Sequence, residues 1–177
     1  ESSAASDVYK RQSPPHIMKY SQIRKYDVAN GEGIRSTIFV TGCTHGCKGC
    51  FNQEYWDFNY GDDWDQEATD KIISYLKDPN VSGLTLLGGE PMQNLELTNV
   101  LRDIKKQVQK NIWIYSGYTY EQIVADPKKL DLLKECDILV DGLFVEKLKN
   151  LKLKFRGSEN QRIIDIKKSL ESGEVVI

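Results

Sequence analysis

Short apolar runs rich in β-branched residues recur along this chain, and their spacing restricts the folds that the chain can adopt. The runs lie at Thr37–Val40, Leu84–Leu87, Ile112–Tyr115, Ile138–Val140 and Ile163–Ile166. From residue 84 on, successive runs begin 28, 26 and 25 residues apart, which is the spacing of repeated strand–helix units. Because the runs are almost wholly apolar, we predict strands that are buried on both faces, as in parallel sheets.

Helical patterns occupy the segments between these runs. Apolar residues follow helical spacing at Ala68, Ile72, Ile73 and Leu76, and again at Leu97, Leu101, Ile104 and Val108. Thr119 and Gln122 have the spacing of a capping box. Asp126 followed by Pro127 fits an N-cap with proline in the first helical position. We therefore expect helices to alternate with the strands.

The fold class that follows is α/β with a mostly parallel sheet. The chain has 177 residues, which is short of the roughly 250 of a complete eight-stranded β/α barrel. We predict a partial, open β/α barrel of five or six strands, built as one domain over residues 18–177. Residues 1–17 lack apolar periodicity, so we expect a non-native or disordered extension and a natural start at Met18.

Composition excludes several classes of function. A formal net charge of −2 gives no electrostatic footprint for nucleic acid. No apolar run approaches the ~20 residues of a membrane span, and the first residues lack the apolar centre of a secretory signal. We therefore expect a cytoplasmic protein with no nucleic acid partner and no membrane contact, whose cysteines are reduced.

Three of the four cysteines stand together directly after the first apolar run. Cys43, Cys47 and Cys50 have the spacing C-x3-C-x2-C, and their thiolates suit an iron–sulfur cluster or zinc. A structural zinc site needs a fourth ligand, for which His45 and Cys136 are the candidates. Three thiolates on a four-iron cluster would instead leave one iron open to a substrate or cofactor. The spacing alone leaves both possibilities open.

Glycine-rich or polar segments also follow the next three runs. They are Gly88-Gly89-Glu90-Pro91, Ser116-Gly117-Tyr118 and Asp141-Gly142. The carboxyl ends of parallel strands lie at one edge of a sheet, where active sites of such folds form. We therefore expect these segments and the cysteine loop to converge on one pocket.

These motifs carry a resemblance to a known family. The cysteine motif followed by Phe51, with GGEP at residues 88–91, resembles the radical S-adenosylmethionine (SAM) superfamily. The segment Asn30–Arg35 resembles the NGxGxR segment of small glycyl-radical activases, and residues 112–118, 140–145 and 156–162 continue in register. The whole set, from Met18 to about Lys168, resembles the activating proteins of anaerobic ribonucleoside-triphosphate reductase.

The resemblance implies two cofactors and a set of residues that bind them. Cys43, Cys47 and Cys50 would hold a [4Fe-4S] cluster whose open iron chelates SAM. The residues expected to bind SAM are Gly88, Gly89 and Glu90 at its amino group, Phe51 at its adenine, Ser116 and Gly117 along the pocket, and Asp141 near the far rim. Beyond the cluster and SAM, no further catalytic residue is implied.

The implied reaction is the installation of a glycyl radical on the partner reductase. One electron, from a flavodoxin-type donor, would cleave SAM to methionine and a 5′-deoxyadenosyl radical, which would abstract hydrogen from a backbone glycine. Two alternatives remain open from the sequence. One is another small radical SAM enzyme, such as a different glycyl-radical activase or a 7-carboxy-7-deazaguanine synthase-like protein. The other is a zinc-binding interaction module without catalysis.

Overall fold

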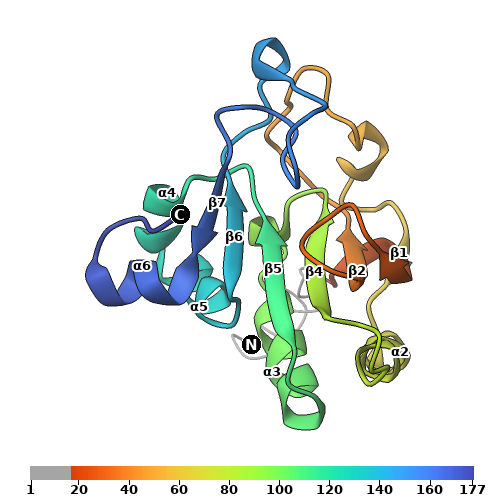
Figure 1. Cartoon of the computed structure of the whole chain (residues 1–177). Coiled ribbons are helices and arrows are strands. Elements are labelled where there is room, and N and C mark those ends of the chain that lie inside the picture. The colour runs from red at the N-terminus through yellow and green to blue at the C-terminus, as the bar shows by residue number, and fades with distance from the viewer. Residues whose placement is uncertain (1–16) are drawn as a thin grey trace, which may run out of the picture.

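A computed structural model describes residues 17–177 as a single sheet with helices packed on it (Figure 1). The extension predicted at residues 1–17 lies, except for Ile17, outside the described residues. Seven strands form the sheet in the order β3-β1-β2-β4-β5-β6-β7. Their bounds are β1 Lys19–Asp27, β2 Arg35–Val40, β3 Asp62–Asp63, β4 Gly83–Gly88, β5 Asn111–Tyr115, β6 Ile138–Asp141 and β7 Arg162–Asp165. The sheet is open, with β3 and β7 at its two edges.

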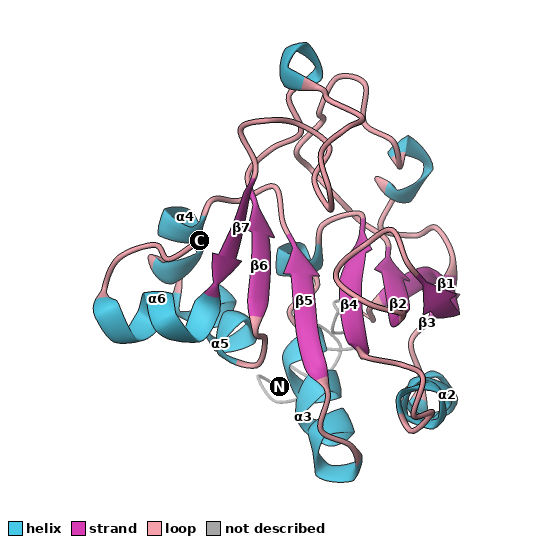
Figure 2. Cartoon of the chain, in the orientation of Figure 1, coloured by secondary structure: helices cyan, strands magenta, loops and turns pink. Residues whose placement is uncertain are grey.

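The sheet is mixed, so the prediction of a mostly parallel sheet holds only for its centre. Strands β2, β4, β5 and β6 run parallel to one another. The pairings of β1 with β2, β1 with β3 and β6 with β7 are antiparallel. Figure 2 shows β7 running against the arrows of β4, β5 and β6. Five predicted strands are present, and the last of them has the opposite direction to the one expected.

The first strand was not predicted, because its sequence does not resemble that of the central strands. Lys19–Asp27 carries mostly polar residues, and its side chains are largely half-buried rather than buried. An antiparallel strand near an edge can expose one side to water, so it needs no continuous apolar run. Strand β3 consists of two exposed aspartates, so its sequence has no apolar pattern from which a strand could be predicted.

The helices confirm the sequence patterns closely. Their bounds are α2 Gln66–Leu76, α3 Leu97–Gln107, α4 Tyr120–Val124, α5 Pro127–Lys134 and α6 Ile166–Ser172, with 3-10 turns η1 Gln53–Tyr55, η2 Pro91–Gln93 and η3 Glu146–Leu148. The capping box of Thr119 and Gln122 is present, and the Asp126 carboxylate accepts the backbone N–H groups of Lys128 and Lys129 at the start of α5. None of the helices in residues 17–177 has the length and apolar character that a membrane crossing requires.

The two faces of the sheet are buried in different ways. On β4 and β5, Leu84, Leu86, Ile112 and Ile114 join the large core against the helices. Side chains alternate along a strand, so the residues between them face the other way. There Leu87 packs with Phe39 and Tyr55, and Tyr115 packs against that cluster. The continuous apolar runs therefore reflect one face under helices and a second face under loops.

A buried arginine fixes the loop that connects β1 to β2 on this second face. Arg35 is 2% exposed, and its guanidinium donates to Thr85 Oγ1 (2.8 Å) and to the carbonyls of Glu32, Leu84 and Asn111 at 2.9–3.0 Å. Thr85 in turn donates to the Asn30 carbonyl at 2.7 Å. Burial lowers the pKa of Arg35 to about 10, so it stays charged at neutral pH. Neutral acceptors thus satisfy this cation and hold residues 30–32 against β4.

Replacement of Arg35 by methionine should destabilise the protein. The change leaves several buried acceptors without donors, and we expect a loss of about 3 kcal/mol in the free energy of unfolding. Urea denaturation followed by circular dichroism measures this loss. Lys106→Met, on the exposed side of α3, is the matched control and should stay within about 0.5 kcal/mol of the parent. Equal stability of the two variants would contradict the structural role of Arg35.

Candidate functional site

A cavity of about 340 Å³ lies on the second face of the sheet, where the central parallel strands end. The segments predicted to converge do so. Nine of the ten predicted site residues line this cavity: Cys43, Cys47, Cys50, Phe51, Gly88, Gly89, Glu90, Ser116 and Gly117. The exception is Asp141, whose neighbour Gly142 lines the cavity instead.

The cysteine loop is held to the sheet by its own backbone. Gly42 and Cys43 donate N–H bonds to the carbonyls of Tyr55 (2.7 Å) and Trp56 (3.0 Å), and the Gly42 carbonyl accepts from Glu90 N–H at 2.8 Å. Gly89 must be glycine, because a Cβ there would lie 2.6 Å from the Gly42 carbonyl oxygen. The close approach of these two loops brings the cysteines beside the GGEP segment.

Each of the three cysteine sulfurs lies near a backbone N–H group. His45 and Phe144 donate backbone hydrogen bonds to Cys43 and Cys47, and Asn52 N–H lies 3.4 Å from Cys50 Sγ. Burial raises the pKa of Cys43 to about 11, so that thiol is protonated at neutral pH when no metal is bound. A cluster would displace these protons, and the N–H groups would then stabilise the thiolates. The donor set therefore fits an iron–sulfur cluster.

Glu90 is a buried carboxylate at the base of the cavity. Its side chain is 1% exposed and has four hydrogen-bond partners. Oε2 accepts from Met92 N–H (2.9 Å) and Ser116 Oγ (2.8 Å). Oε1 accepts from Gly117 N–H (2.7 Å) and lies 2.7 Å from His45 Nε2. The GGEP turn, the loop after β5 and the cysteine loop therefore meet at one carboxylate.

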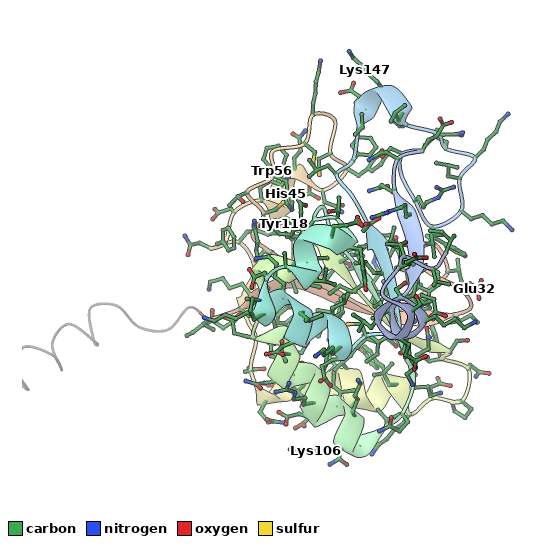
Figure 3. All side chains as sticks on the ribbon, turned by 90° about the vertical axis from the view of Figure 1, so that its left-hand side faces the viewer. Glu32, His45, Trp56, Lys106, Tyr118 and Lys147 are labelled. Atoms are coloured by element: carbon green, nitrogen blue, oxygen red, sulfur yellow. The ribbon has the colours of Figure 1, made fainter. Side chains whose placement is uncertain are left out.

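A second set of contacts joins the same loops. Gln93 accepts from Thr44 N–H (3.0 Å) and donates to Thr44 Oγ1 (2.6 Å) and to the Tyr118 hydroxyl (2.9 Å). The His45 ring packs edge-on against Tyr118, with centroids 4.7 Å apart. Figure 3 shows His45 and Tyr118 side by side, far from Lys106 at the other end of the molecule. The sequence suggested His45 only as a fourth ligand for zinc and did not predict its contacts with Glu90 and Tyr118.

The segment that leads into β7 supplies a further wall. Because β7 runs antiparallel to β6, the residues before it lie at the same edge as the other loops, and Phe155, Arg156, Gly157 and Gln161 line the cavity. Gln161 holds this segment: its side chain accepts from Gly157 N–H (2.8 Å) and donates to the Gly142 carbonyl (3.0 Å). Only the direction of β7 reveals this wall, and the sequence did not predict that direction.

Asp141 is buried but already paired. Its Oδ2 accepts Tyr120 N–H at 2.8 Å, at the start of α4, and Arg162 contacts both carboxylate oxygens at 3.1 and 2.5 Å. These bonds fix the end of β6. The carboxylate therefore holds the rim of the cavity in place, and Gly142 forms its lining.

The structure offers no support for a zinc site. Cys136 lies at the opposite end of β6, buried in the core with its thiol 3.5 Å from the Leu132 carbonyl. His45 Nε2 contacts Glu90. Among residues 17–177, no three His, Cys, Asp or Glu side chains gather closely enough to hold a single metal ion.

Two comparisons with known proteins agree with this geometry. Residues 29–164 match the family described as "4Fe-4S single cluster domain". This range begins in the loop held by Arg35 and ends in β7, so it contains every segment that lines the cavity.

Relatives from distant sources cover most of the chain. The chain is 42% identical over 152 residues to the anaerobic ribonucleoside-triphosphate reductase-activating protein of Vibrio cholerae. The alignment covers 82% of this chain and 97% of the relative. The proteins of that name from Enterobacteria phage T4 (38% identical, 82% and 93% covered) and Escherichia coli K12 (36%, 81% and 96%) are also similar. The chain therefore belongs to the single-cluster [4Fe-4S] family and, within it, to the anaerobic ribonucleoside-triphosphate reductase-activating proteins.

Proposed function

We propose that this protein is a radical SAM activase that generates a glycyl radical on anaerobic ribonucleoside-triphosphate reductase. The observation that carries the proposal is the convergence of the three cysteines and the GGEP loop on one cavity. When bound, the cluster and SAM supply the one-electron cleavage that yields a 5′-deoxyadenosyl radical, which takes hydrogen from a glycine of the reductase. The protein supplies ligation, orientation and exclusion of side reactions.

Cys43, Cys47 and Cys50 are the proposed cluster ligands. Three ligands leave one iron open, and the cavity beside it is the proposed place of SAM. Glu90 is the only carboxylate among the described residues that line the cavity, so its charge attracts the ammonium of SAM toward Gly88 and Gly89. This assigns the ammonium end of SAM to the loop after β4.

The remaining contacts with SAM are assigned along the cavity wall. Ser116 and Gly117 form the side of the pocket, and Phe51 packs by the adenine. Phe51 is 56% exposed, which leaves part of its surface open to a flat base. Its ring centroid lies 5.0 Å from that of Phe144 and 5.1 Å from Lys149 Nζ. Asp141 acts indirectly, through the position of Gly142.

The fold, partner and electron donor follow from the same proposal. The architecture we assign to the open sheet is a partial, open β/α barrel of the radical SAM type, with the cavity on its loop-covered face. The partner is the glycyl-radical subunit of the reductase, and the donor is a flavodoxin-type protein. The open edge of the cavity is where a glycine of the partner would have to enter.

Alanine variants of the three motif cysteines should lose SAM cleavage. Each removes one cluster ligand, so we expect 5′-deoxyadenosine formation to fall at least a hundredfold after anaerobic reconstitution. Chromatography of the products measures the loss. Cys136→Ala is the matched control, because that thiol is buried far from the cavity, and it should cleave SAM at a rate close to that of the parent. Normal cleavage by any motif variant would exclude that cysteine as a ligand.

Mixing the reduced, SAM-loaded protein with its partner should produce a protein-based radical. Electron paramagnetic resonance (EPR) of anaerobic mixtures should show a glycyl radical with the reductase and none with pyruvate formate-lyase. This experiment separates the proposed activase from other small radical SAM enzymes. A radical on the wrong partner, or on neither, would refute the assigned substrate.

The cluster should be sensitive to air. An iron that must bind SAM cannot be fully shielded, so oxygen should reach it through the open side of the cavity. We expect the visible absorbance of the reconstituted cluster to disappear within minutes of exposure to air, and more slowly when SAM is present. An absorbance that persists for hours would contradict the open iron.

A further inference from the structure

The Glu90 carboxylate has no acceptor position left over. A carboxylate offers about four lone-pair sites on its two oxygens. Met92 N–H and the Ser116 hydroxyl occupy Oε2, and Gly117 N–H and His45 Nε2 occupy Oε1, all within 2.7–2.9 Å. The orientation of this buried charge is therefore set completely by four donors.

The four donors come from three different segments. Met92 belongs to the turn that follows Glu90, and Ser116 and Gly117 belong to the loop after β5. Only His45 belongs to the cysteine loop, where it lies between Cys43 and Cys47. Its imidazole is thus the direct side-chain link between the cysteine motif and the carboxylate of the GGEP motif.

The His45 ring is itself held in place. Its side chain is 13% exposed and packs against Tyr118. On another side it covers Gly117, where a Cβ would lie 2.7–2.8 Å from ring atoms. A glycine at residue 117 is therefore needed for the ring to reach Glu90. Because a carboxylate oxygen can only accept, we assign Nε2–H as the donor in this contact.

We propose that His45 is a positioning residue for SAM. Its Nε2–H fixes Glu90 relative to the cysteine loop, and so sets the distance between the cluster ligands and the loop that receives the ammonium of SAM. The inference rests on the proposed function, in which one loop carries the cluster and the other receives the ammonium. Without the Nε2–H, Glu90 Oε1 loses one of its two donors, the buried charge is held less firmly beside the loop of Gly88 and Gly89, and its attraction for the ammonium weakens. The three cysteine ligands remain in place.

A pair of variants separates the hydrogen bond from the packing of the ring. His45→Phe keeps an aromatic ring against Gly117 and Tyr118 but has no N–H. His45→Gln loses the ring but places a carboxamide N–H at about the reach of Nε2. If His45 only fills space, the phenylalanine variant is the better substitute; if it positions Glu90, the glutamine variant is.

The experiment is a SAM titration of the reconstituted, reduced proteins, with the SAM-induced change of the [4Fe-4S] EPR signal as readout. We expect His45→Phe to raise the SAM dissociation constant by about tenfold to a hundredfold, as for a lost hydrogen bond to a charged group. His45→Gln should remain within about threefold of the parent. Iron content per chain is measured for each protein, so that occupancy is compared on the cluster-loaded fraction.

A double-mutant cycle with Glu90→Gln tests the route of the effect. If His45 acts through Glu90, the changes in SAM affinity from His45→Phe and Glu90→Gln should not add. Equal SAM affinity for His45→Phe and His45→Gln, or fully additive changes in the cycle, would overturn the assignment. An unmodified protein whose cluster signal does not respond to SAM would instead refute the proposed function itself.

Discussion

The parallel pairing of β2, β4, β5 and β6 is the constraint on which the rest of the structure depends. Parallel strands end at the same edge, so every connection out of them starts within reach of the others. The cysteine loop follows β2, the GGEP segment follows β4, and Ser116–Gly117 follow β5. Residues that lie more than 70 positions apart in the chain therefore line one cavity.

Loops at such an edge need bonds of their own to keep a defined arrangement. Here a buried carboxylate supplies them, because a charge removed from water is costly unless donors surround it. Glu90 collects its donors from three loops, and this requirement couples the positions of those loops. Arg35, a buried cation, also couples separate segments, because its guanidinium donates to backbone carbonyls in three of them. Both ionic groups lie on the loop-covered side of the sheet, where the apolar helix layer is absent.

Patterns that depend on neighbouring residues were read correctly from the sequence. The five apolar strands, the helix over Gln66–Leu76, the capping box at Thr119 and the proline start of α5 all arise from local preferences. The cysteine motif and the glycine-rich segments could be placed at strand ends for the same reason. The prediction was wrong for strands outside the parallel centre of the sheet. It did not include β1, and it expected β7 to run parallel to β6, whereas β7 is antiparallel. Strand direction depends on the partner strand, and the residues of a strand do not encode it.

The sequence by itself therefore determined the α/β class, the residues of the strand-end loops and the membership of the three cysteines in one motif, because spacing and periodicity are local properties. Only the tertiary structure decided that Arg156 and Gln161 face the same cavity, through the reversal of β7. It alone decided that Asp141 pairs with Arg162, and that His45 meets Glu90 across 45 residues. Such contacts depend on the orientation of each side chain after packing, and the hydrogen-bond requirements of buried charges then select among the available partners.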